Sequence, residues 1–142
     1  MTPEDRLQIS VARSFTLTLP LAPSVNALFA NRRPPKEEPA IAKLKKKQRG
    51  RVKTEAYVLW IARAGWTLKM QRPPSFSGPV AVTIGVPLKM PGDLDNRCKA
   101  TLDLLQTMRV IANDRDVHDL RVKRCLPQQT TMVVTVEGRI AA

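Results

Sequence analysis

The feature that most constrains the fold is an abrupt change of composition between residues 31 and 53. Prolines are frequent in the first part of this segment, and closely spaced lysines and arginines fill the second part. Such a segment cannot bury enough apolar surface to join a hydrophobic core. We therefore predict that residues 31–51 form a flexible basic insert, and that the rest of the 142-residue chain builds a single domain around one core.

Apolar periodicity predicts a strand before this insert and a helix directly after it. Residues 13–19 alternate between polar and apolar side chains, which predicts a strand with one buried face. From residue 52 to 70, apolar side chains recur every three or four positions, which predicts an amphipathic helix. Because Trp60 and Trp66 belong to its apolar stripe, we expect both in the core rather than as platforms for stacked bases.

The second half of the chain predicts a strand, a helix and two further strands. The strand covers residues 80–86, and the helix runs from about 95 to 108. Residues 119–125 and 131–136 predict the last two strands, whose short connection favours an antiparallel pair. The order β-α-β-α-β-β predicts an α/β fold of the α+β kind, with a mixed sheet of about four strands and two main helices. The buried side of the second helix is expected to contain Cys98, Leu102, Leu105 and Met108.

The charge balance indicates a polyanionic partner. Lysine and arginine number 24 against 12 acidic residues, which gives a net charge of +12. Nucleic acid fits this balance better than a membrane, because no apolar run approaches the roughly 20 residues that span a bilayer. Composition alone leaves a ribosome-like or chromatin-like structural protein open. The candidate phosphate contacts are Lys43, Lys45, Lys46, Lys47, Arg49, Arg51, Lys53, Lys89 and Arg97.

The two cysteines and the single histidine argue against several other kinds of site. Cys98 and Cys125 lack any metal-binding spacing, so neither a zinc site nor a disulfide framework is indicated. His118 leaves little for a histidine metal site or a Ser-His-Asp triad. We expect no small-molecule cofactor. The N-terminus shows no pattern typical of a secretory signal, so we expect a protein of the reducing cytoplasm.

Two carboxylates follow the second predicted strand. Asp93 and Asp95 are two positions apart, so in an extended backbone they project to the same side and could clasp one hard cation. A helix cap is the open alternative for either residue. Lys99 lies one helical turn after Asp95 and could reach a metal-bound phosphate, with a surface ion pair as the alternative. Asp103 continues this face, where a lone acid is more often solvated or paired with a base than a metal ligand.

A third carboxylate, Asp114, follows the second predicted helix. A helix of about 14 residues travels roughly 20 Å, and the extended chain from Met108 to Asp114 can recover about that distance. A helix that ran past Met108 would prevent this closure. Ligation by oxygen alone suits Mg²⁺ or Mn²⁺, the cations of phosphodiester hydrolysis. The pattern therefore predicts a magnesium-dependent nuclease with metal ligands Asp93, Asp95 and Asp114.

Several ordered motifs resemble the RusA family of Holliday-junction resolvases. Pro23-Ser-Val-Asn26 resembles the turn after the family's first strand, and Asp93-Leu-Asp95-Asn96 followed by Lys99 resembles its central signature. Asn113-Asp114 followed by Val117 resembles its Asp-Asp pair. The resemblance implies a homodimer that nicks symmetric strands of a four-way DNA junction with Mg²⁺ or Mn²⁺, in a setting such as phage DNA processing. It places the catalytic roles on Asp93, Asp95, Asp114 and Lys99.

The chain departs from this family pattern at three places. The first acid of the pair is Asn113, which spares Asp114. The basic run before the Asp-x-Asp motif is reduced to Lys89, so phosphate contacts are expected from the insert, with a plain solvated linker as the alternative. A glycine usual after the second helix is missing at Met108-Arg109, so a different helix end is expected.

Two other functions stay open on the sequence alone. One is a non-catalytic basic DNA-binding accessory protein of a phage or mobile element, whose binding would survive removal of metal ions. The other is an RNA-binding structural protein, which is least favoured because aromatic residues at 4% leave few platforms for stacked bases.

Overall fold

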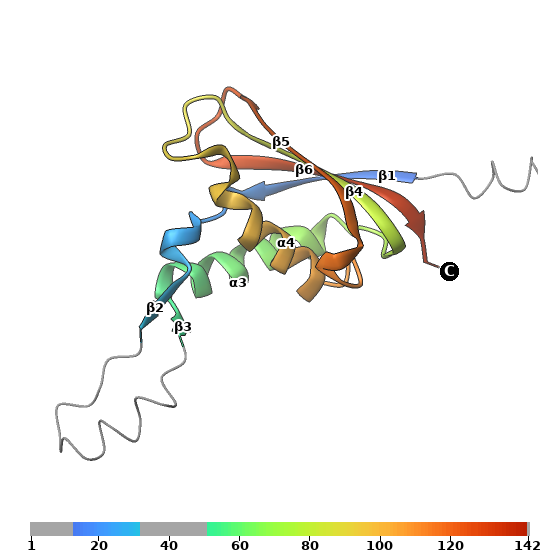
Figure 1. Cartoon of the computed structure of the whole chain (residues 1–142), viewed down its shortest axis with the longest axis horizontal. Coiled ribbons are helices and arrows are strands. Elements are labelled where there is room, and N and C mark those ends of the chain that lie inside the picture. The colour runs from blue at the N-terminus through green and yellow to red at the C-terminus, as the bar shows by residue number, and fades with distance from the viewer. Residues whose placement is uncertain (1–12, 32–50, 142) are drawn as a thin grey trace, which may run out of the picture.

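The computed structural model describes residues 13–31 and 51–141 and shows a mixed sheet with two helices packed on one face (Figure 1). The helices are α3 (Glu55–Met70) and α4 (Cys98–Thr107). This arrangement confirms the predicted fold class. The main sheet contains β1 (Arg13–Pro20), β4 (Phe76–Pro87), β5 (Val117–Leu126) and β6 (Thr131–Ile140). The short elements are β2 (Phe29–Asn31), β3 (Arg51–Lys53) and the 3₁₀ turns η1 (Val25–Ala27), η2 (Leu94–Arg97) and η3 (Asp114–Asp116).

The strand order of the main sheet is β1-β6-β4-β5. Strand β6 runs antiparallel to both β1 and β4, whereas β5 runs parallel to β4. The predicted antiparallel pairing of the last two strands is therefore wrong, because β4 lies between them. Burial explains the order: alternate residues of β6 are buried, which suits a central strand, whereas most side chains of β5 are exposed, which suits an edge.

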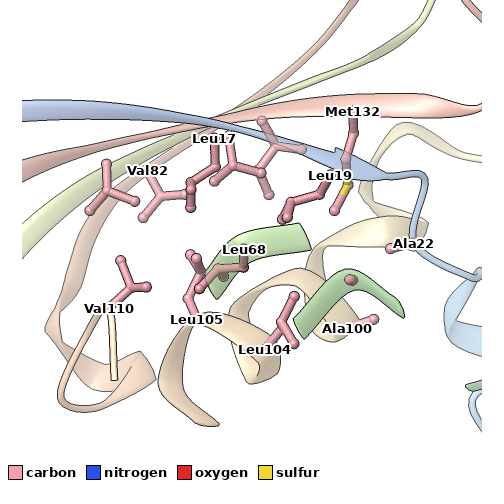
Figure 2. Packing of buried hydrophobic residues seen from close by; sticks show 14 of the residues in the cluster. Leu17, Leu19, Ala22, Leu68, Val82, Ala100, Leu104, Leu105, Val110 and Met132 are labelled. Carbon is pink, nitrogen blue, oxygen red and sulfur yellow. The ribbon is translucent and has the colours of Figure 1, made fainter. Parts of the chain in front are cut away.

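The core lies between the helix-facing side of the sheet and the two helices (Figure 2). Leu17, Val82 and Met132 contribute from the sheet, and each is fully buried. Leu68 of α3 and Leu105 of α4 meet them from the helices (Figure 2). Burial of this apolar surface is the main term that stabilises the fold and fixes where α4 lies against the sheet.

Helix α3 begins later than predicted and presents a different face to the sheet. The side chain of Thr54 accepts a hydrogen bond from the backbone N–H of Tyr57, which starts the helix at Glu55. Trp60 is buried as predicted, and its Nε1 donates to the carbonyl of Pro20 at 3.0 Å. The prediction for Trp66 is wrong, since its side chain is 66% exposed. The helix carries apolar residues on two sides, and periodicity could not decide which side packs on the sheet.

Helix α4 is shorter than predicted because its first turn is the 3₁₀ turn η2. Leu105 is buried as predicted, whereas Cys98, Leu102 and Met108 are only half-buried beside the core, and Ala100, Thr101 and Leu104 take the buried positions. The helix ends at Thr107 and the chain reverses at once. Arg109 adopts a φ of 60°, its N–H donates to the carbonyl of Gln106 at 3.1 Å, and Val110 donates to Leu105 at 2.9 Å. This is the Schellman end that glycine usually forms.

The predicted insert lies largely outside the described residues, which omit residues 32–50. Its expected end residues, Asn31 and Arg51, are partners in the antiparallel ladder of β2 and β3. Val52 and Lys53 continue β3, and therefore do not belong to the helix as predicted. Within the described ranges, no helix has both the length and the apolar character needed to cross a bilayer.

Candidate metal centre and DNA-binding surface

The Asp93 and Asp95 motif stands on a loop that β5 holds in place. The guanidinium of Arg124 forks across this loop: Nη1 donates to the carbonyl of Met90 at 3.1 Å, and Nη2 donates to that of Gly92 at 2.7 Å. Gly92 adopts a φ of 85°, a conformation that favours glycine. The backbone that leads into Asp93 is therefore fixed by hydrogen bonds from a strand some 30 residues later in the chain.

The side chains of Asp93 and Asp95 are exposed. Asp93 occupies the N-cap position of η2, yet its side chain makes no capping hydrogen bond. Among the described residues, neither carboxylate forms a hydrogen bond or an ion pair. Burial, and then the charge of Asp95, raise the pKa of the Cys98 thiol, which places Asp95 close to the start of α4. Both carboxylates are thus available to bind a cation.

Arg97 ties the first family motif to the second. Its Nη1 donates to the carbonyl of Ala22 at 2.6 Å, just before Pro23-Ser-Val-Asn26. Burial lowers the pKa of the half-buried guanidinium, and its Nε has no partner among the described residues. Arg97 was predicted as a phosphate contact. Its side chain holds the turn that contains Asn26 beside η2, and the phosphate contact stays a prediction.

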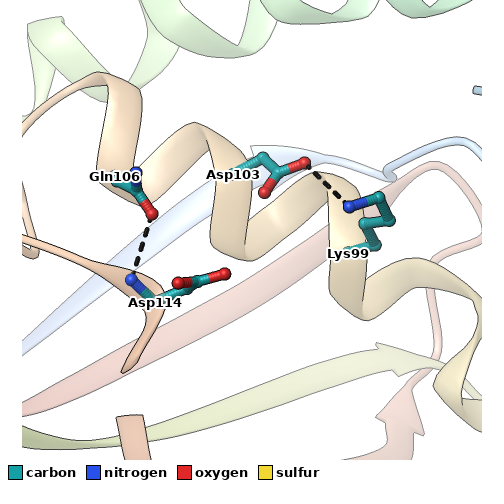
Figure 3. A network of polar contacts seen from close by, with 4 residues as sticks. All are labelled: Lys99, Asp103, Gln106 and Asp114. Atoms are coloured by element: carbon teal, nitrogen blue, oxygen red, sulfur yellow. Dashed lines mark hydrogen bonds and ion pairs between the residues drawn. The ribbon is translucent and has the colours of Figure 1, made fainter. Parts of the chain in front are cut away.

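Lys99, Asp103 and Asp114 lie on one side of α4 (Figure 3). Lys99 Nζ and Asp103 Oδ2 are 3.6 Å apart, so each residue has the surface ion pair that the sequence left as an alternative. The backbone N–H of Asp114 donates to the side-chain oxygen of Gln106 at 3.0 Å. Asn113 caps η3 by accepting a hydrogen bond from the N–H of Arg115 at 3.0 Å. The residue that departs from the family's acidic pair therefore supports the turn that contains Asp114.

The three predicted ligands do not form a closed cluster in this structure. Among the residues that it describes, no three histidine, cysteine, aspartate or glutamate side chains gather closely enough to hold a metal ion. The donor chemistry nevertheless fits a hard cation, because Mg²⁺ binds through one or two carboxylates together with water and substrate phosphates. Helix α4 ends at Thr107, before Met108, the last residue that would still let Asp114 return toward Asp93 and Asp95. Both η2 and η3 contact this helix. Asp93 and Asp95 would supply the one or two carboxylates that Mg²⁺ needs, even without Asp114.

Basic side chains occur on several elements: Lys89 next to the loop, Lys53 on β3 and Arg121 on β5. Lys89 is exposed next to the loop, and Lys53 lies with its Nζ 5.8 Å from the centroid of the Tyr57 ring. Arg121, which the sequence did not single out, is exposed on β5 and lies 3.6 Å from Asp119. The close spacing of basic residues in the predicted strand 119–125 could have indicated that β5 contributes to a DNA-binding surface. Five other candidate phosphate contacts lie outside the described residues: Lys43, Lys45, Lys46, Lys47 and Arg49. Of Arg51, only the backbone in β3 is described.

The family assignment rests on a match that covers both carboxylate motifs. A search of curated proteins found no match to this chain. A family model described as Endodeoxyribonuclease RusA matches residues 32–137, which include Asp93, Asp95, Lys99 and Asp114. The match extends over most of the chain, from the segment before β3 to within β6. The chain therefore belongs to the RusA family and is an endodeoxyribonuclease.

Proposed function

We propose that the chain resolves Holliday junctions by symmetric, magnesium-dependent nicking, and that it acts as a homodimer. Family membership implies nuclease activity on such junctions and binding of branched DNA. The single observation that supports cation dependence is the pair of exposed carboxylates, Asp93 and Asp95, which no other described residue engages and which stand on a loop fixed by Arg124. Mn²⁺ would serve in place of Mg²⁺, because both prefer oxygen ligands.

In this proposal Asp93, Asp95 and Asp114 hold the cation. When bound, the cation supplies an activated water and neutralises charge on the scissile phosphate. Three carboxylates that come together repel one another, and a bound cation would offset this repulsion. Gln106 and Asn113 fix the backbone on either side of Asp114, which leaves its side chain to turn toward η2.

Lys99 is proposed to stabilise negative charge that develops on the phosphate. Its ion pair with Asp103 is partly exposed on both sides, with side-chain exposures of 53% and 39%. An exposed pair of this kind contributes only about 0.2–1 kcal/mol. The Lys99 ammonium group can therefore leave Asp103 and bind a phosphate oxygen at little cost in free energy. Before DNA binds, the ion pair with Asp103 holds this ammonium group near the proposed site of the phosphate.

An apolar stripe on α3 supports the proposed homodimer. Leu59, Trp66 and Met70 recur along one side of the helix and are 64%, 66% and 67% exposed. Three large apolar side chains on one exposed face mark an interaction surface. Self-association through this stripe would produce a two-fold dimer, whose symmetry matches that of a four-way junction. Lys53, Lys89 and the basic insert are the proposed phosphate contacts.

The proposal is tested by cleavage of linear, forked and four-way DNA of the same sequence, with Mg²⁺ or with EDTA. We expect paired symmetric nicks in the four-way junction alone, and none in EDTA. Asp95→Asn should abolish cleavage and keep junction binding, because it removes a negative charge near phosphate. Asp119→Asn is the matched control, since Asp119 is an exposed acid of β5 paired with Arg121, and it should cut normally. Full cleavage by Asp95→Asn would overturn the assignment.

A further inference from the structure

A cavity of about 200 Å³ opens between α3 and α4, next to the paired strands β2 and β3. Phe29, Tyr57 and Ile61 contribute an aromatic and aliphatic wall, and Lys53, Asp103 and Gln106 contribute polar groups. Neither the metal loop nor the exposed stripe of α3 contributes to its lining. The lining is therefore about equally apolar and polar, which suits a ligand with an apolar face and polar edges.

The aromatic wall of this cavity is held rigidly. The rings of Phe29 and Tyr57 meet edge to face with centroids 5.7 Å apart, and Tyr57 stacks on Trp60 at 6.3 Å. Trp60 is in turn anchored by its hydrogen bond to the carbonyl of Pro20. Tyr57 and Trp60 are themselves buried, so the half-buried Phe29 offers the ring against which a planar ligand can stack. Because Tyr57 and Trp60 fix this ring in advance, stacking costs little entropy.

The polar groups of the cavity supply both donors and acceptors. Lys53 Nζ lies above the Tyr57 ring, and Gln106 can donate and accept. Burial, and then the negative charge of Asp103, raise the pKa of Tyr57, so its hydroxyl stays protonated as a donor. The Asp103 carboxylate disfavours a second phosphate in the cavity, whereas a neutral planar group with edge donors and acceptors matches the lining.

The cavity shares two residues with the proposed catalytic side of α4. Asp103 is the ion-pair partner of Lys99, and Gln106 holds the backbone of Asp114. A phosphodiester held by Lys99 would therefore have its neighbouring nucleoside beside the cavity. A volume of about 200 Å³ lies below the roughly 300–1,000 Å³ of sites for larger ligands, which favours one base over a dinucleotide.

We propose that this cavity binds one unpaired nucleobase that flanks the scissile phosphate at the branch point of the junction. Bases at a branch point have already lost part of their stacking, so extrusion of one of them costs less there than within a duplex. The inference rests on the proposed junction-cleaving function and adds to it a contact that selects the nucleotide at the cut.

The test is junction affinity in EDTA, where no cleavage occurs, using four-way junctions with an abasic site at each branch-flanking position in turn. We expect the abasic site to weaken binding about tenfold at one position in the symmetric arms, within the range of base–aromatic stacking. Equal affinity for every abasic junction would overturn the proposal.

Variants of Ile61 connect this effect to the cavity. Ile61→Phe fills the cavity and should bind the intact junction about tenfold more weakly, with no further loss at the abasic position. Ile61→Val is the control and should keep the wild-type discrimination. If Ile61→Phe fails to fold by circular dichroism, Lys53→Met at the polar rim should reduce the discrimination without altering the core. Full discrimination in a folded cavity variant would overturn the assignment.

The two proposals fail in distinguishable ways. A protein that cuts junctions with Mg²⁺ but ignores the abasic sites would overturn the base cavity alone. A protein that discriminates among abasic junctions in EDTA but never cuts with Mg²⁺ would overturn the proposed function and leave the base contact in place.

Discussion

Arg109→Gly should stabilise this protein, although it removes a charged side chain. Arg109 ends α4 with a φ of 60°, a left-handed conformation that costs an L-residue roughly 1–2 kcal/mol. Glycine adopts it freely but loses about 0.5–1 kcal/mol more chain entropy on folding. The difference predicts a net gain of about 0.5–1 kcal/mol. The Arg109 side chain is exposed and has no hydrogen bond or ion pair among the described residues to lose.

The gain is measured by urea unfolding and thermal melting followed by circular dichroism. For a chain of this size, 1 kcal/mol corresponds to about 2–4 °C in Tm. Arg63→Gly is the control, because it removes the same charge from an exposed position inside α3 and should destabilise by about 1 kcal/mol. If Arg109→Gly lost stability as Arg63→Gly does, the backbone at Arg109 would not be strained. Junction cleavage should survive Arg109→Gly, since the turn toward Asp114 is kept.

Three further substitutions test the site and the dimer. Arg124→Ala frees the loop before Asp93 and should raise the Mg²⁺ concentration for half-maximal cleavage about 10–100-fold, as loss of a supporting contact does, whereas Arg121→Ala should not. Lys99→Ala should reduce the single-turnover rate constant of cleavage about 10²–10³-fold with little change in junction affinity. An unchanged rate constant would show that Lys99 has no role in catalysis. Trp66→Glu should yield a monomer by light scattering, and a persistent dimer would exclude the α3 stripe as the interface.

The order of the elements could be predicted because each strand and helix has its own apolar periodicity. The alternation in residues 13–19 predicted β1, and the apolar spacing predicted α3, although Trp60 and Trp66 were both assigned to the core. Which side of α3 faces the sheet depends on contacts distant in sequence. One such contact is Gln71, whose side chain donates to the carbonyl of Thr18 at 2.7 Å and accepts from its N–H at 2.8 Å.

Local sequence patterns could not predict which strands β5 and β6 pair with, or which residue supports the loop before Asp93. A connection as short as residues 127–130 usually joins neighbouring strands, yet here it passes β4, because the exposed β5 suits only an edge. The positions of Asp93 and Asp95 after a strand could be predicted from spacing. The hydrogen bonds of Arg124 to Met90 and Gly92 join residues more than 30 positions apart and have no signature in the sequence.

The central proposal is that three carboxylates distant in the sequence share a divalent cation. Crystals of the protein with a four-way junction and Mn²⁺ would locate the cation by anomalous scattering. We predict a peak at about 2.0–2.3 Å from carboxylate oxygens of Asp93, Asp95 and Asp114 of one protomer. A peak that contacts none of these carboxylates, or an Asp114 that stays remote from a cation held by Asp93 and Asp95, would contradict it.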